Sequence, residues 1–413
     1  MRPLHHNLPA PRARAPRSAG SGVTPTVSTK RSGRTRDRTA RRPLRLLLVA
    51  GARPNFMKIA PLLRELRARP DLFDPRLLHT GQHYDDLMSD VFFQDLEIPP
   101  PDVHLGVGSA THAVQTARIM EAFEKVLADD RPDWVVVVGD VNSTLACSVV
   151  AAKASPPIRV AHVEAGLRSR DRTMPEEINR IVTDALSDLL FTTGADADRN
   201  LIAEGVAPRR IHRVGNVMID TLRRFLARAD SSDVMRRLGV APPFALLTLH
   251  RPSNVDDADA LRRIFAALEV IARDLPIIFP IHPRTLKMIE SLGVRVAPAR
   301  GGGPAAARGL RLVEPLGYLD FLHLQKRARL VLTDSGGIQE EASILGVPCL
   351  TLRDNTERPI TLTRGTNRLV GSDTGRIVAA ARRILRAPAP RPKAIPLWDG
   401  RAARRIAAVF ARY

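Results

Sequence analysis

Short apolar segments alternate with longer helical segments in two successive series, and this alternation limits the possible folds more than any other feature of the 413-residue chain. The first series of predicted strands lies near 44–50, 76–80, 134–139, 159–163, 189–193 and 211–214, and the second near 244–249, 277–281, 310–313, 330–333 and 349–352. Strands that are apolar along their whole length are typical of parallel sheets covered by helices on both faces. The sequence therefore predicts an α/β protein with two doubly wound, Rossmann-like domains that face a central cleft.

The chain divides into four predicted segments, with the helical stretch 221–229 marking the join between the two series. The segments are a disordered basic extension at 1–43, an N-terminal Rossmann-like domain at 44–220, a C-terminal Rossmann-like nucleotide-binding domain at 221–392 and a C-terminal helix at 393–413. Residues 1–43 contain eleven Lys and Arg and a single acid, Asp37, and so supply half of the formal net charge of +20. Their few large apolar residues cannot form a core, although transit peptides and nucleic-acid-binding arms have a similar composition.

Composition also narrows the class of protein. No apolar run approaches the roughly 20 residues of a membrane-spanning helix, so no membrane partner is expected. The two cysteines, Cys147 and Cys349, lie in apolar segments without a CxxC partner, which indicates buried thiols in a reducing compartment, here the cytoplasm. The histidines are scattered and no HExxH motif occurs, so we expect no metal and no cofactor, and Arg, Lys and His must supply positive charge near any phosphate.

Parallel strands bring their carboxyl ends to one edge of a sheet, where ligands bind, so the residues after each predicted strand are the functional candidates. In the first series, Gly51 permits a turn, and Arg53 and Lys58 lie near a helix start. Their charge opposes the helix dipole and favours a bound anion, unless both are merely exposed surface cations. Asp140 follows a later strand, although it could instead cap the next helix. Glu164 ends a buried strand, where a carboxylate needs either a partner or a function.

An acidic helix start follows at Pro175-Glu-Glu. Proline suits the first turn of a helix and glutamates suit its dipole, so Glu176 and Glu177 have a structural explanation that Glu164 lacks.

The second series carries basic residues at its strand ends. His250 and Arg251 follow one strand, and a second His–Arg pair, at 282 and 284, follows another, which favours a cationic, anion-binding edge. Ser335-Gly336-Gly337 links a strand directly to a helix, so its backbone N–H groups can bind a phosphate. This stretch is neither a Walker A nor a GxGxxG sequence, so neither ATPase nor NAD chemistry follows. Glu341, one turn into that helix, could reach a sugar hydroxyl or could be an ordinary exposed residue. A carboxylate edge facing a cationic edge indicates a nucleotide-sugar ligand.

Ten collinear blocks closely resemble the non-hydrolysing UDP-N-acetylglucosamine 2-epimerases. They are GARPNFMKIAP, TGQHYDDLMSDVFF, VVGDVNSTLA, HVEAGLRS, MPEEINR, VGNVMID, LHRPSN, TDSGGIQEEA, LRDNTERP and GTNRLVG, and they cover about 44–390. The resemblance implies a GT-B-like architecture in which the final helix, around 400–411, returns to the first domain. It also implies a homodimer that binds a UDP-sugar substrate.

The resemblance further implies reversible interconversion of UDP-GlcNAc and UDP-ManNAc for cell-envelope polysaccharides, by anti elimination of UDP to a 2-acetamidoglucal and its re-addition. By motif match, the carboxylates of Asp140, Glu164 and Glu176 serve the proton transfers and the positive charge on the ring. The other matched residues lie near the diphosphate or reacting centre (Arg53, Lys58, His250 and Arg251), bind phosphate (Ser335, Gly336 and Gly337) or bind ribose (Glu341).

Two departures bear on regulation and on substrate choice. Bacterial members of the family can bind a second UDP-GlcNAc as an activator, through positions that match Gln82, His83 and Arg118. Here Tyr-Asp-Asp-Leu-Met follows His83, where regulated members usually carry Arg and then Gln or Glu ahead of Met, which argues against activation. The spacer RSRDRTMPEE and the block LHRPSN also resemble relatives that epimerise other 2-acetamido sugars, including diacetamido-uronates.

Three other interpretations remain open. A GT-B glycosyltransferase shares the expected fold but needs an acceptor groove, and the three carboxylates argue against it. A hydrolysing epimerase would release free ManNAc and UDP; the eukaryotic bifunctional forms append a sugar-kinase domain for which this chain has no room. A nucleic-acid-binding protein would use the basic extension, and its affinity would then fall steeply with salt. Only three tyrosines and two tryptophans are present for base stacking, which argues against nucleic acid as the main partner.

Overall fold

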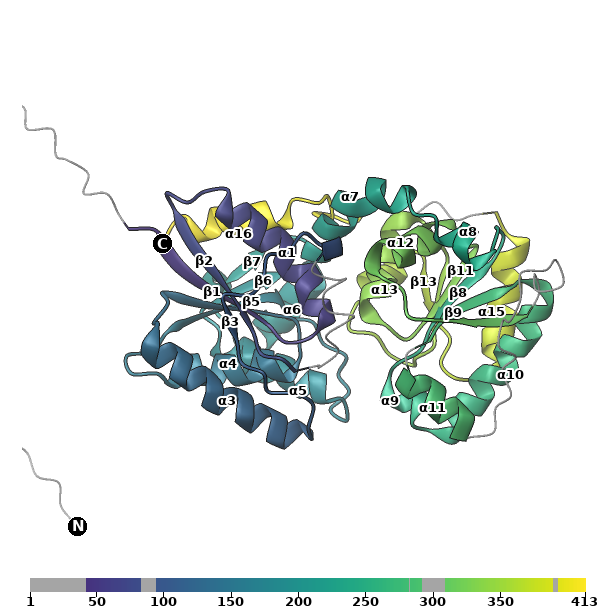
Figure 1. The fold of residues 1–413 in the computed structure, drawn as a ribbon, viewed down its shortest axis with the longest axis horizontal. Helices are drawn as coiled ribbons and strands as arrows, with labels where there is room; N and C mark the ends of the chain where they lie inside the picture. The colour runs from purple at the N-terminus through teal and green to yellow at the C-terminus, as the bar shows by residue number, and fades with distance from the viewer. Residues whose placement is uncertain (1–41, 83–93, 282, 292–308, 389–392) are drawn as a thin grey trace, which may run out of the picture. The chain divides into compact units, whose positions relative to one another are not determined.

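The computed structural model describes residues 42–82, 94–281, 283–291, 309–388 and 393–413, apart from the side chains of residues 53, 283 and 284. Within these ranges the chain forms two parallel sheets with helices between their strands (Figure 1). This architecture confirms the predicted α/β fold class.

The first sheet has the strand order β3-β2-β1-β4-β5-β6-β7, and all of its neighbouring strands pair in parallel. Its strands are β1 (Leu44–Ala50), β2 (Phe73–His79), β3 (Val103–His104), β4 (Trp134–Val138), β5 (Arg159–Ala165), β6 (Leu189–Thr192) and β7 (Ile211–Arg213). The helices between them are α1 (Arg53–Arg67), α3 (His112–Asp129), α4 (Asn142–Lys153), α5 (Pro175–Leu186) and α6 (Ala195–Ala203). The strand order reverses between β1 and β4, which is where a doubly wound sheet binds its ligand.

The second sheet repeats this arrangement with the order β10-β9-β8-β11-β12-β13, again in parallel. Its strands are β8 (Ala245–Thr248), β9 (Ile277–Pro280), β10 (Leu310–Val313), β11 (Leu330–Thr333), β12 (Cys349–Thr351) and β13 (Asn367–Leu369). Its helices are α9 (Pro252–Val255), α10 (Ala258–Asp274), α11 (Pro283–Ser291), α12 (Tyr318–Arg327), α13 (Gly336–Leu345), α14 (Ile360–Thr363) and α15 (Thr374–Arg386). The order reverses between β8 and β11, so the residues after these two strands share one edge.

Helices α7 (Val217–Asp230) and α8 (Val234–Leu238) connect the two sheets, and α16 (Ala402–Phe410) ends the chain. Helix α16 lies beside α1 on the first sheet (Figure 1). There Phe410 packs edge-on against Trp134 and Phe191 at ring distances of 5.6 and 5.5 Å. The final helix thus packs on the first sheet; the division into domains, including a separate C-terminal segment at 393–413, stays a prediction.

The predicted strands all occur, but two further strands were not predicted. β3 and β13 are two and three residues long and lie at the sheet edges, so they are too short to produce a recognisable apolar pattern. Helix α7 begins four residues before the predicted stretch 221–229, because the side chain of Asn216 caps it by accepting from Met218 N at 2.9 Å.

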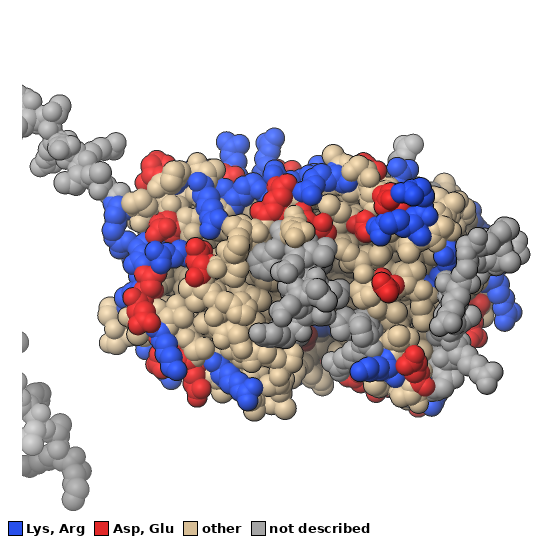
Figure 2. Space-filling model, in the orientation of Figure 1, with Lys and Arg blue, Asp and Glu red and all other residues tan. Residues whose placement is uncertain are grey.

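Surface charge in the described part of the chain is mixed, with acidic and basic side chains interspersed on the face that Figure 2 shows. Cys147 and Cys349 are free and buried. No helix among the described residues is long and apolar enough to cross a bilayer.

Candidate active site

Asp140 lies two residues after the end of β4 and pairs with a buried arginine. Its carboxylate contacts Arg180 Nη1, and it does not cap α4, whose N-cap residue is Val141. The preceding Gly139 has a φ of 68°, and a Cβ there would lie 2.7 Å from Lys58 Nζ, so the strand end requires glycine. Burial raises the pKa of Asp140, but the charges of Arg180 and Lys58 outweigh burial and lower it below its ordinary value. Asp140 is therefore an ionised carboxylate at the edge of the sheet.

Glu164 lies at an irregularity near the end of β5. Its φ is 73°, and the pairing of β5 with β6 shifts register between Val163 and Ala165. A non-glycine residue in this conformation costs about 1–3 kcal/mol, so the surrounding structure must hold it. The carboxylate is 3% exposed and pairs with Lys58 and with Arg358, whose Nη2 lies 2.6 Å away. The buried carboxylate thus has two cationic partners.

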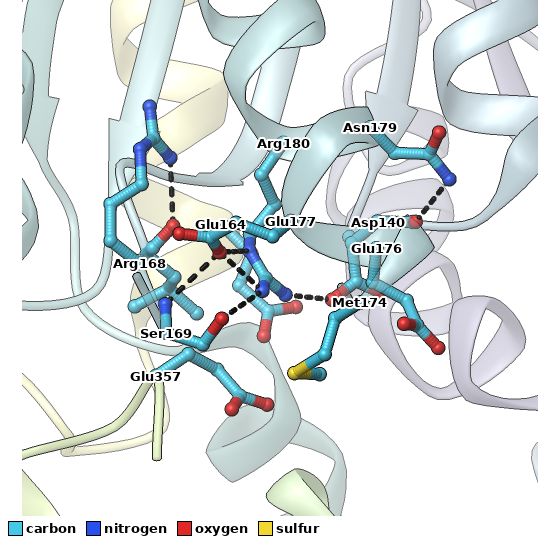
Figure 3. Close-up of polar contacts among 12 residues, drawn as sticks. Asp140, Glu164, Arg168, Ser169, Met174, Glu176, Glu177, Asn179, Arg180 and Glu357 are labelled. Atoms are coloured by element: carbon cyan, nitrogen blue, oxygen red, sulfur yellow. Dashed lines mark hydrogen bonds and ion pairs between the residues drawn. The ribbon is translucent and has the colours of Figure 1, made fainter. Parts of the chain in front are cut away.

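Glu176 and Glu177, in the first turn of α5, differ in what they contact. Glu177 is buried and accepts backbone hydrogen bonds from Ser169 and Arg170 at 3.0 and 2.8 Å, besides pairing with Arg180. It therefore shapes the loop between β5 and α5, in agreement with its structural interpretation. Glu176 instead accepts from Arg251 Nη1, on the second sheet, at 3.1 Å. Figure 3 shows Arg180 between Asp140 and Glu177, and it shows Glu176 on the same side of Arg180 as Asp140.

His250 and Arg251 follow β8 and share a buried partner at the end of β11. Asp334 Oδ1 lies 2.8 Å from His250 Nδ1, and the same carboxylate accepts from the backbone N–H groups of His250 and Arg251. Burial raises the pKa of Asp334, but the charge of His250 and these hydrogen bonds lower it to about 2. Because this contact uses Nδ1, Nε2 is the ring nitrogen that remains for a ligand, and the side chain is 53% exposed.

The Ser-Gly-Gly turn begins α13, with Ser335 as its N-cap residue. A Cβ on Gly336 would lie 2.2 Å from Arg358 Nη1, whereas one on Gly337 would make only an ordinary contact with Met218. Gly336 thus lets a guanidinium group lie across the helix N-terminus. The positive charge of Arg358 is unfavourable beside the positive end of the helix dipole. An anion bound at this helix N-terminus would be attracted by both the guanidinium group and the dipole.

Glu341 is buried in α13, so the alternative of an exposed helical glutamate is wrong. Tyr318, at the start of α12, donates its hydroxyl to Glu341 Oε1 at 3.1 Å. Burial raises the pKa of Glu341 to about 8, although the hydrogen bond from Tyr318 works in the opposite direction.

The block LRDNTERP supplies three site residues that the sequence did not single out: Arg353, Glu357 and Arg358. Arg358 is surrounded by Glu164, Glu357 and Glu340, and its Nε lies 2.8 Å from Glu340 Oε1. Arg353 Nη2 pairs with Glu357 at 2.9 Å. These residues follow β12, so the rule applied to the other strand ends also points to them.

The expectation of one acidic and one cationic edge is wrong for the described residues. Arg180 and Lys58 lie among the carboxylates of the first sheet, while Glu340 and Glu357 lie among the arginines of the second. Buried carboxylates without such counterions would be too costly to keep ionised. The edges instead interlock: Arg358 with Glu164 and Arg251 with Glu176 join the two sheets.

The remaining predicted residues divide into three groups. His83, His282 and the side chains of Arg53 and Arg284 lie outside the described part of the chain. Gly51 lies so close to α4 that a Cβ would reach 2.2 Å from Ser143 Oγ, so close approach explains it rather than a left-handed turn. Gln82 is buried, with Oε1 accepting from Ser143 Oγ at 2.7 Å, whereas Arg118 is exposed on α3.

Two parallel sheets whose strand ends interlock through carboxylates and guanidinium groups form a GT-B-like α/β protein. Comparison with known proteins agrees. The family model described as UDP-N-acetylglucosamine 2-epimerase matches residues 64–411. The chain belongs to the UDP-N-acetylglucosamine 2-epimerase family and is, by that membership, an isomerase.

Individual relatives cover most of this chain. The UDP-N-acetylglucosamine 2-epimerase of Methanocaldococcus jannaschii is 41% identical over 375 residues, which is 89% of this chain and 99% of the relative. Its crystal structure in complex with UDP-GlcNAc and UDP aligns with a TM-score of 0.81 over 90% of this chain and 100% of the other. The UDP-2,3-diacetamido-2,3-dideoxy-D-glucuronate 2-epimerase of Pseudomonas aeruginosa is also 41% identical, over 83% of this chain and 92% of the relative.

Proposed function

We propose that this enzyme reversibly interconverts UDP-GlcNAc and UDP-ManNAc without hydrolysis. The observation that carries the proposal is a group of three carboxylates at one edge of the first sheet: Asp140, Glu164 and Glu176. Each of them pairs with a cationic side chain. Inversion at C2 needs one group to remove a proton and another to return it on the opposite face, and a transferase needs no such pair.

The C2 proton is not adjacent to a carbonyl group, so removing it directly meets a high barrier. In the proposed reaction the C1–O bond breaks and its electron pair leaves with UDP. Positive charge then builds on the ring, the C2 proton passes to a carboxylate, and C1=C2 forms in a 2-acetamidoglucal. A proton delivered to the opposite face of C2 and attack of the UDP oxygen on C1 complete the inversion.

The cations of the site suit the leaving diphosphate. Arg358 lies at the N-terminus of α13 beside Gly336, and His250 presents Nε2 from the end of β8. A fixed array of such groups stabilises the charge that develops on UDP, and it keeps UDP beside the glycal for the return step. We assign phosphate binding to Ser335, Gly336 and Gly337 with Arg53, Lys58 and Arg251, and ribose binding to Glu341.

A second candidate substrate is a UDP-2,3-diacetamido-uronate. The P. aeruginosa relative named for that reaction is as similar in sequence as the M. jannaschii relative. The elimination chemistry is the same for both sugars, so only the contacts to C3 and C6 of the sugar separate them.

Proton NMR of the purified enzyme with each UDP-sugar in D2O tests the proposal. UDP-ManNAc carrying deuterium at C2 is the expected product from UDP-GlcNAc. Free ManNAc and UDP would instead establish a hydrolysing enzyme, and turnover of the diacetamido-uronate alone would establish the second candidate. The predicted homodimer is checked on the same sample by light scattering.

A further inference from the structure

The backbone at Glu164 is held by residues that lie behind the site. Glu164 has its positive φ within a register shift of β5, so the strand alone does not fix the direction of its side chain. A strained residue persists only where its neighbours determine it. His162 and Gly166 lie two positions before and two positions after Glu164.

One buried carboxylate on α5 holds both of these flanking residues. Asp184 Oδ1 lies 2.6 Å from His162 Nδ1, and Asp184 Oδ2 accepts from the Gly166 backbone N–H at 3.0 Å. Arg168 Nη1 also lies 2.7 Å from Oδ2. The side chains of His162 and Asp184 are 0% and 1% exposed. The irregular segment around Glu164 is therefore tied to α5 on both sides.

The second ring nitrogen of His162 contacts the segment after β4 that carries Asp140. Nε2 lies 2.8 Å from the carbonyl oxygen of Gly139, the residue before Asp140. That peptide is constrained as well, because Gly139 has a positive φ and lies against Lys58. His162 thus connects the segment that carries Glu164 to the peptide that carries Asp140.

Both ring nitrogens of His162 have hydrogen-bond partners behind the site. The Gly139 carbonyl has no proton to donate, so Nε2 donates to it. Nδ1 lies beside Asp184 Oδ1, while the Gly166 N–H and Arg168 contact Oδ2. Burial raises the pKa of Asp184, but the charges of His162 and Arg168 outweigh burial and lower it below its ordinary value.

We propose that His162 is a positioning residue whose two ring nitrogens, hydrogen-bonded to Asp184 and to the Gly139 carbonyl, fix the relative placement of Glu164 and Asp140. Its effect on catalysis rests on the proposed epimerase function, whereas its hydrogen bonds do not. An apolar residue would fill the same volume, but it would leave a buried carboxylate and a carbonyl oxygen without their donors.

The hydrogen bonds of the ring are tested in the full chain with 15N-histidine labelling and two-bond 1H–15N spectra. His162 is expected to show a slowly exchanging Nε2–H proton, because this donor is buried and hydrogen-bonded to the Gly139 carbonyl. Asp184→Asn identifies the signal, because only the ring in contact with Asp184 should shift strongly. A ring whose Nε2 carries no proton would overturn the proposal.

The positioning role is tested with His162→Asn and Asp184→Asn. In both variants kcat is expected to fall about 10- to 100-fold, while KM and the Kd for UDP change less than about threefold, because only the placement of the acid and base is disturbed. Glu204→Gln is the matched control. Glu204 pairs with the outer side of Arg168 at 2.6 Å and is not in contact with His162, so kcat should be unchanged.

Unchanged kcat in both variants, or an equal loss in Glu204→Gln, would reject the positioning role. If His162→Asn fails to fold, the conservative Asp184→Asn and the spectra of the wild-type protein still decide the question. A wild-type enzyme that converts neither UDP-sugar would reject the proposed function while leaving the test of the hydrogen bonds intact.

Discussion

Arg358 Nη2 lies 2.6 Å from Glu164 Oε1, and this contact joins residues that are 194 positions apart on the two sheets. Lys58 contacts the other oxygen of the same carboxylate. Glu164 therefore lies between a cation from α1 and a cation from the loop after β12. A diphosphate bound at the N-terminus of α13, as proposed, would lie beside the same guanidinium group.

Replacing Glu164 by Gln should reduce epimerisation at least about 100-fold, because the amide keeps the shape of the side chain but cannot accept the proton. UDP should bind as tightly as before, since Lys58 and Arg358 keep their charges. Turnover is followed by NMR and UDP binding by calorimetry. Glu65→Gln on α1, which alters only a partly exposed pair with Arg69, serves as the control. Retained turnover in Glu164→Gln would remove this residue from the proton-transfer groups.

Replacing Asp334 by Asn should lower kcat about 10- to 100-fold, because the carboxylate sets the orientation of His250 through Nδ1. A normal kcat would mean that the orientation of His250 does not matter for the reaction.

Asp334 should also make the stability of the fold depend on pH in the acidic range. The pKa of Asp334 is about 2, below the ordinary value of 3.8. The ionised carboxylate therefore stabilises the fold when the pH lies above this ordinary pKa. That contribution is lost as the pH falls from about 4 towards 2. Wild type and Asp334→Asn should therefore differ most in unfolding free energy near neutral pH and converge in acid. A constant difference between the two proteins would contradict this assignment.

Much of this architecture could be predicted from the sequence, because strands such as Trp134–Val138 are apolar throughout and end at chemically distinct residues. The same reasoning found Asp140 and Glu164, since a charged residue at the end of a buried strand needs a partner or a function. The local pattern did not reveal which charges pair, because Arg180 lies on a helix and Arg358 in a loop. Their partners are set by tertiary contacts across 40 and 194 positions. Whether Glu341 is exposed likewise depends on the approach of Tyr318, which no pattern in α13 encodes.

The buried carboxyl group of Glu341 should make stability change with pH in the opposite direction. Burial raises its pKa from 4.5 to about 8, so the folded state binds this proton more tightly than the unfolded chain does. Stability should therefore fall as the pH rises from about 4.5 to about 8, and Glu341→Gln, which cannot ionise, should lack this part of the dependence. Thermal unfolding of both proteins across this pH range measures the difference. The Tyr318 hydroxyl lowers the pKa of Glu341, so Tyr318→Phe should move the dependence to higher pH. Identical profiles for wild type and Glu341→Gln would show that burial does not perturb this carboxyl group.

Truncating Phe410 should show how much the packing of the final helix against the first sheet contributes to the free energy of unfolding. Its ring is 1% exposed and contacts Trp134 and Phe191, so Phe410→Ala leaves a cavity between α16 and the sheet. The expected loss is about 3–5 kcal/mol in the free energy of unfolding, measured by urea titration with tryptophan fluorescence. Ile202→Ala is the control, because Ile202 is 53% exposed and its truncation should change stability by no more than about 0.5 kcal/mol. A loss below about 1 kcal/mol for Phe410→Ala would mean that α16 is not an integral part of the first core.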